Sequence, residues 1–214
     1  MNDDGMINRF NMVAEWIYFL LKVQVLWWLG LFCGGIIFGF FPATFSLFGV
    51  MRKRLQLKEE ETWSLFWRGY RENFVITQLV GFMSLGIGLF LYMDIRILQS
   101  YETPFAQLMA NLLIGISIIH LLCSSIVAAV YVHFRLRIRD IVKLAVTIII
   151  TQPAIALGIS FVLGVTVLFL LFLPILVFLI GFSMCAYFVM KLALASFQKV
   201  EEVEFIRSPE GSST

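Results

Sequence analysis

The stretch from Leu144 to Met190, LAVTIIITQPAIALGISFVLGVTVLFLLFLPILVFLIGFSMCAYFVM, carries no formal charge. As a single α-helix it would be about 70 Å long, roughly twice the hydrocarbon thickness of a bilayer. We therefore expect two membrane-spanning helices joined by a tight turn. Gly164–Val165 and Leu173–Pro174 are both possible turns. We place the turn near Gly164, which predicts spans at 144–163 and 166–190.

The remaining chain is nearly as apolar. Hydrophobic residues make up 60% of the 214 residues and charged residues 14%, against about 45–50% and about 25% in soluble proteins. A chain of this size cannot bury so much apolar surface in one soluble core, so lipid must be its solvent. Three further apolar runs predict spans at 16–41, 74–93 and 106–132.

The fold class that we expect is all-α, a polytopic membrane helix bundle of about five transmembrane helices. The short loops leave no room for a soluble domain, so we expect a single domain over 1–204 and a disordered tail over 205–214. This composition excludes a soluble enzyme, a disordered regulator and a nucleic-acid-binding protein.

The lysine and arginine residues predict the orientation of the chain, because cytoplasmic loops carry an excess of them. With five spans, most of the 16 cations fall on one side of the membrane. These are Arg52, Lys53, Arg54, Lys58, Arg68, Arg71, Arg135, Arg137, Arg139, Lys143, Lys191, Lys199 and Arg207. The other side keeps Arg9 and Arg96, and Lys22 lies within the first span. We therefore expect the N-terminus outside and the C-terminus in the cytoplasm.

The loop after the first span has the most distinctive pattern. It opens with the basic cluster Arg52, Lys53 and Arg54, and an amphipathic helix is predicted near 62–73. The aromatic residues of that helix recur at helical spacing and form one face: Trp63, Phe66, Trp67, Tyr70 and Phe74. Arg68 and Arg71 lie off this face. We interpret the helix as lying on the inner membrane surface, where it contacts lipid or a protein partner.

Small residues in the first span predict close helix packing. Gly30 and Gly34 are four positions apart, as are Gly35 and Gly39, and Pro42 follows. This spacing allows two helix backbones to approach closely within the bundle or in a homo-oligomer.

The same first span carries a polar stripe at helical spacing: Asn8, Asn11, Glu15, Tyr18 and Lys22. The spacing is compatible with a stripe facing either the headgroups or other helices.

Few polar groups lie within the spans. His120 falls near the middle of the third span, and Gln152 precedes Pro153 in the fourth. No Asp or Glu lies in a span interior, so neither a catalytic pair nor a proton relay is predicted. We expect no catalytic residue, metal ligand or cofactor. His120 and Gln152 are the candidates for an intramembrane polar site.

The sequence also resembles a known family. The run Gly39-Phe40-Phe41-Pro42-Ala43-Thr44, the run Phe48-Gly49-Val50-Met51-Arg52-Lys53, and Phe66-Trp67-Arg68-Gly69-Tyr70-Arg71-Glu72-Asn73-Phe74 ending at Gly81 are similar to the signature of the bacterial YesL-like family. The resemblance implies a multi-pass protein of the cytoplasmic membrane of Gram-positive bacteria. The family is of unknown function and is often associated with carbohydrate uptake. It supplies no established catalytic residues.

Two functions are compatible with these features. The first is a non-catalytic accessory or regulatory partner of a carbohydrate uptake system, bound to an ABC-type sugar transporter subunit or a membrane sensor. The alternative is a stand-alone small transporter or channel for a polar solute, lined by His120, Gln78 and Gln152.

Overall fold

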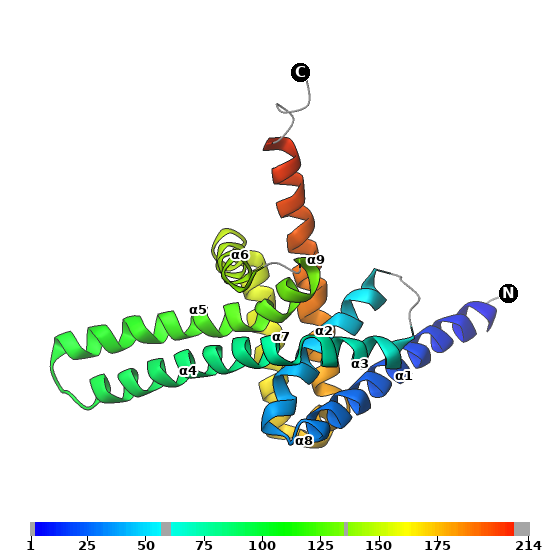
Figure 1. The fold of residues 1–214 in the computed structure, drawn as a ribbon, viewed down its shortest axis with the longest axis horizontal. Helices are drawn as coiled ribbons and strands as arrows, with labels where there is room; N and C mark the ends of the chain where they lie inside the picture. Colours follow the sequence, from blue (N-terminus) through cyan, green and yellow to red (C-terminus); the bar gives the residue numbers. More distant parts are fainter. Residues whose placement is uncertain (1–2, 57–60, 135–136, 208–214) are drawn as a thin grey trace. The chain divides into compact units, whose positions relative to one another are not determined.

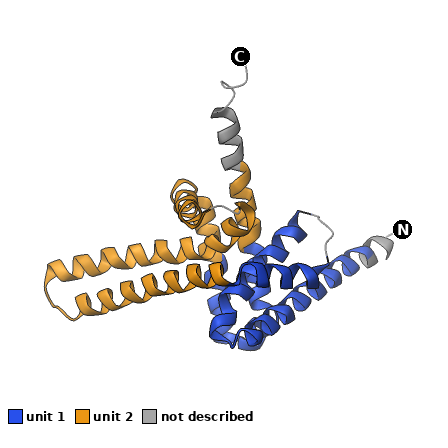
Figure 2. Cartoon of the chain, in the orientation of Figure 1, with its two compact units in different colours: residues 1–74, 162–188 blue, residues 75–161, 189–214 orange. Residues whose placement is uncertain are grey.

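The computed structural model describes residues 3–56, 61–134 and 137–207, which form helices with no strand among them (Figure 1). The predicted all-α class is confirmed. Five helices in these ranges are long and apolar enough to cross a membrane. They are Asn8–Cys33, Phe74–Gln99, Pro104–Phe134, Pro153–Phe172 and Pro174–Gln198. The helix contacts divide the chain into two compact units, shown in Figure 2: residues 1–74 with 162–188, and residues 75–161 with 189–214. The single domain over 1–204 stays a prediction.

The first unit begins with a helical hairpin of α1 (Asp3–Cys33) and α2 (Ile37–Leu55). The predicted span 16–41 is therefore wrong at its end, because the chain reverses after Cys33. The Ile36 N–H donates to the Leu31 carbonyl at 2.9 Å, and the Gly35 N–H donates to that of Phe32 at 3.0 Å. Gly35 has φ +69°. These bonds form the glycine C-cap that ends many helices.

The turn is completed by a residue with an unusual backbone. Ile36 has φ 66° and ψ −68°, and the Ile37 N–H donates to the Gly35 carbonyl at 2.8 Å. This is a γ-turn with positive φ, which is rare and strained for a β-branched residue. The strain is held by the packing of the two helices that it joins.

A short helix, α3 (Thr62–Glu72), packs on this hairpin and lies where the amphipathic helix 62–73 is predicted. The first unit also holds the end of α7 (Pro153–Phe172), α8 (Pro174–Leu176), the π-helical turn η1 (Val177–Gly181) and the start of α9 (Phe182–Arg207).

The boundary between the last two spans is at Leu173–Pro174, so the predicted turn near Gly164 is wrong. Gly164 lies inside α7. Leu173 leaves the helical region with φ −138° and ψ 61°, and Pro174 has no N–H with which to continue the helix. Gln152–Pro153 likewise separates α6 (Ile138–Thr151) from α7. The predicted spans 144–163 and 166–190 are thereby replaced by 153–172 and 174–198.

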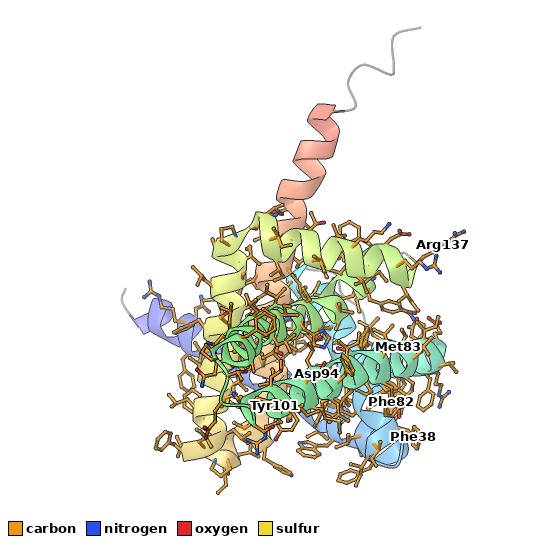
Figure 3. All side chains as sticks on the ribbon, turned by 90° about the vertical axis from the view of Figure 1, so that its left-hand side faces the viewer. Phe38, Phe82, Met83, Asp94, Tyr101 and Arg137 are labelled. Atoms are coloured by element: carbon orange, nitrogen blue, oxygen red, sulfur yellow. The ribbon has the colours of Figure 1, made fainter. Side chains whose placement is uncertain are left out.

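The second unit contains the antiparallel hairpin of α4 (Phe74–Gln99) and α5 (Pro104–Phe134), whose helices run side by side in Figure 1. Large apolar side chains project from α4, including Phe82 and Met83, which are labelled in Figure 3. Helix α6 packs on α5, and a leucine of α9, Leu192, packs against Gly158 of α7. Exposed apolar side chains are the expected surface of helices that lipid surrounds.

Part of the predicted disordered tail is helical, because α9 continues to Arg207. This corrects the prediction for 205–207. Residues 208–214 of that tail lie outside the described residues, as do Lys58 and Arg135 of the charge count.

Candidate functional site

Helix α3 is anchored to the hairpin by its aromatic residues. The ring of Phe66 is fully buried against Gly30 and Ala43, where a methyl group on Gly30 would lie 3.1 Å from the ring. The Tyr70 hydroxyl donates to the Gly30 carbonyl at 2.8 Å. This corrects the prediction that Phe66 and Tyr70 lie on a lipid- or partner-facing surface. Because Tyr70 is 6% exposed, burial raises the pKa of its hydroxyl, with a smaller contribution from the nearby Cys33.

The other side of α3 lines an open groove of about 770 Å³. Trp63 is 49% exposed, and its ring centroid lies 6.0 Å from that of the half-buried Trp67. Arg68 and Arg71 are exposed on the same helix. The groove is lined by Cys33, Trp63, Ser64, Trp67, Arg68, Arg71 and Glu72. The indole Nε1 of Trp67 is buried and has no hydrogen-bond partner among the described residues.

The basic cluster lies away from this groove. Arg52, Lys53 and Arg54 form the last turn of α2. The guanidinium of Arg54 lies 5.1 Å from the ring centroid of Phe19 on α1. Phe19 and Gly30 are about 16 Å apart along α1, at 1.5 Å per residue. The structure therefore separates two groups that sequence reasoning had placed on one loop surface, the basic cluster and the face of α3.

Three of the four predicted packing glycines lie at close approaches within the hairpin. A methyl group on Gly34 would overlap the backbone of Gly39, and one on Gly39 would lie 2.7 Å from the Gly30 carbonyl oxygen. Gly35 differs, because its surroundings are open and its positive φ forms the turn. Pro42 is buried inside α2.

The polar stripe of α1 lies on the exposed side of that helix. Asn8, Asn11, Glu15, Tyr18 and Lys22 are all exposed. The buried side of α1 instead carries Phe19, Leu20, Val23, Leu26 and Trp27.

Sequence reasoning missed Gln24, a buried polar side chain of the first unit. Gln24 is 1% exposed. Its Nε2 donates to the Phe178 carbonyl at 3.2 Å, and its Oε1 accepts from the Ser183 N–H at 2.9 Å. The Trp28 indole N–H donates to the same Phe178 carbonyl at 3.0 Å. The Gln24 amide thus stands between two backbone groups that a π-helical turn would join to each other. The sequence signal that could have identified Gln24 is an uncharged polar residue within an apolar run.

The two predicted intramembrane polar residues contact different helices of the second unit. His120 Nε2 lies 3.0 Å from the Ser84 carbonyl, and the Ser84 and Ser124 hydroxyls are 2.7 Å apart. Gln152 Nε2 donates to the Ser196 carbonyl of α9 at 3.5 Å. Gln78, the third predicted lining residue, is buried near the start of α4. The described residues include no group of three or more His, Cys, Asp or Glu that could hold a metal ion.

Comparison with known proteins identifies one matching family and several similar bacterial proteins. The family described as "Protein of unknown function, DUF624" matches residues 20–95, which include the second half of α1, α2, α3 and most of α4. No solved structure matches the chain.

Three proteins of Bacillus subtilis (strain 168) are similar along most of the chain. The uncharacterized protein YesL is 27% identical over 91% of this chain and 92% of its own length. The uncharacterized protein YteU is 30% identical, with coverage of 94% and 91%. The uncharacterized protein YesV is 28% identical, with coverage of 82% and 85%.

Proposed function

Because the chain belongs to the YesL-like family of membrane proteins of unknown function, we propose that it is a non-catalytic accessory or regulatory subunit in the bacterial cytoplasmic membrane. Its partner is a subunit of an ABC-type sugar importer or a membrane sensor of carbohydrate uptake. The association of the family with carbohydrate uptake supports this choice of partner, and the basic end of α2 supplies the contact.

The observation that carries the proposal is the setting of the basic cluster. Arg52, Lys53 and Arg54 occupy one helical turn, and Arg54 is held over the ring of Phe19. The helix that carries them is fixed to α1 through close glycine contacts. A cationic turn at the end of a helix that packs along α1 favours an acidic surface on a partner, because complementary charges attract across an interface.

The polar side chains within the spans hold helices together, which supports a non-catalytic function. His120 and Ser84 join α4 to α5, and Gln152 joins the break before α7 to α9. The side chains of His120 and Gln152 each contact the backbone of a neighbouring helix. Such contacts hold membrane helices together, where lipid offers no hydrogen-bond partner.

The proposal is tested by affinity purification from native membranes in mild detergent, followed by mass spectrometry. We expect an importer subunit or a sensor to co-purify with the wild-type chain. The double variant Lys53→Glu/Arg54→Glu should lose about 90% or more of that partner, because it reverses two charges at the contact.

The matched control is Arg137→Glu/Arg139→Glu, which changes the net charge equally at two exposed arginines of the second unit. It should retain the partner. Purification of this chain with only further copies of itself would overturn the proposal, as would equal loss of the partner in the control.

One observation favours the alternative, a small transporter or channel. Gln152 Oε1 and Ser196 Oγ are buried without hydrogen-bond partners among the described residues, beside the break between α6 and α7. Buried groups of this kind bind water or a polar solute. Flux of a polar solute into liposomes containing the purified chain alone, abolished by Gln152→Leu, would favour this function over the accessory role.

A further inference from the structure

The groove beside α3 lies between the ends of two candidate membrane spans. The span in α1 ends at Cys33, which lines the groove, and the span in α4 begins at Phe74. Helix α3 lies next to both residues. Its Trp63 lines the groove together with Cys33, and the ring centroids of Tyr70 and Phe74 are 5.6 Å apart. When α1 crosses the bilayer, its end at Cys33 lies at one membrane face. The groove is then at the level of the lipid headgroups.

The lining of the groove has the chemistry of a phospholipid site. Arg68 and Arg71 supply guanidinium groups, which bind phosphate through paired, charge-assisted hydrogen bonds. Trp63 and Trp67 supply indoles, which prefer the boundary between headgroup and acyl chain. Glu72 is the one carboxylate among the lining residues, so the guanidinium charges outnumber it and the groove favours an anion.

The size of the groove also favours a lipid molecule over a lone phosphate ion. Its volume of about 770 Å³ falls within the range of roughly 300–1,000 Å³ that is usual for small-ligand sites. It is much larger than a lone phosphate requires and has apolar as well as cationic walls. A molecule with a charged head and an apolar remainder uses both.

We propose that this groove binds one anionic phospholipid molecule. Its phosphate lies between Arg68 and Arg71, and its glycerol backbone and first acyl carbons lie against Trp63 and Trp67, beside Cys33. The site is separate from the basic end of α2, so the inference does not rest on the proposed function.

The thiol of Cys33 reports occupancy directly, because it is exposed and lines the groove. In the full chain with Cys123→Ala and Cys185→Ala, Cys33 is the remaining thiol. Its alkylation by a neutral maleimide is timed in uncharged detergent with added phosphatidylglycerol, phosphatidylcholine or inorganic phosphate. We expect saturating phosphatidylglycerol to slow alkylation by about fivefold or more, because its charged headgroup is bound in the groove. The other two should have little effect.

Matched variants identify the residues responsible. Arg68→Gln/Arg71→Gln should lose the protection, whereas Arg137→Gln/Arg139→Gln, with the same change in net charge, should keep it. Melting curves matching those of wild type show that both variants are folded. Native mass spectrometry should find one phosphatidylglycerol per wild-type chain and none in the groove variant.

Three results would overturn the inference. Equal protection by phosphatidylcholine would mean that the groove does not select an anionic headgroup. Protection by inorganic phosphate alone would identify an ion site rather than a lipid site. Protection that persists in Arg68→Gln/Arg71→Gln would place the lipid elsewhere. The proposed partner should still co-purify with this variant, so failure of one proposal is distinguishable from failure of the other.

Discussion

The amide of Gln24 occupies the gap between the Phe178 carbonyl and the Ser183 N–H. Without it, these backbone groups would be buried in an apolar setting, where an unpaired group is costly. Aromatic rings surround the contact. The ring centroids of Trp27 and Phe182 are 4.2 Å apart in a stacked pair, and those of Trp28 and Phe178 are 4.3 Å apart. A single side chain thus connects two parts of the first unit that are far apart in the sequence.

We expect Gln24→Leu to lower the free energy of unfolding by about 1–2 kcal/mol, because it leaves the Ser183 N–H unpaired and removes one donor to Phe178. The measurement is thermal unfolding of the purified protein in mild detergent. Gln107→Leu is the matched control, since Gln107 is exposed on α5, and its melting temperature should not fall. A Gln24→Leu variant as stable as wild type would contradict this role.

At the scale of single elements, the ends of the helices are set by glycine and proline. Helix α1 ends at a glycine cap and a strained γ-turn, whereas α7 and α8 each begin with a proline. A proline at the first helical position loses no hydrogen bond, because that N–H has no partner within the helix. These local rules explain why the long apolar stretch breaks at Pro153 and Pro174 and continues through Gly164.

The turn at Gly35 gives a prediction for one element. We expect Gly35→Ala to destabilise the hairpin by about 1–2 kcal/mol, because alanine disfavours positive φ by that amount. A methyl group would meet open space at this position, so the effect isolates backbone strain from packing.

The control is Gly86→Ala in α4, where the surroundings are also open and φ is not positive. Alanine favours a helix interior over glycine, so this variant should melt at or above the wild-type temperature. The prediction fails if both variants shift the melting temperature alike.

At the scale of the whole molecule, the orientation depends on how many helices cross the membrane. The charge count assumes five crossings. The hairpin adds a helix, α2, that runs back along α1 and carries Arg52, Lys53 and Arg54 at its end. Its 19 residues would extend about 28 Å, close to the hydrocarbon thickness. A crossing by α2 would make the number even and place both termini on one side.

We expect five crossings, with the N-terminus outside. In a cysteine-free background, Asn8→Cys and Ser100→Cys should react with a membrane-impermeant thiol reagent in intact cells. Arg137→Cys should react only after permeabilisation, because its loop is rich in Arg and Lys. If Asn8→Cys also requires permeabilisation, α2 crosses the membrane and the N-terminus is cytoplasmic.

The helical class, the number of apolar spans, the approximate bounds of the second and third spans and the helix near 62–73 could all be predicted from the sequence alone. These properties follow from hydropathy and helical period, which depend on residues close together in the chain. The glycine spacing also indicated a close approach, although the approach is between α1 and α2 within one hairpin.

Which aromatic side chains stay exposed depends on how the helices pack against one another. Phe66 and Tyr70 belong to the same aromatic stripe as Trp63, yet they are buried by Gly30, Gly34 and Ala43. The reversal after Cys33 separates the basic cluster from the groove of α3, and Gln24 meets Phe178 across more than 150 positions. Contacts of this range depend on how helices fold back on one another. No local pattern of hydropathy or charge encodes that arrangement, because the same stripe can face lipid, a partner or another helix.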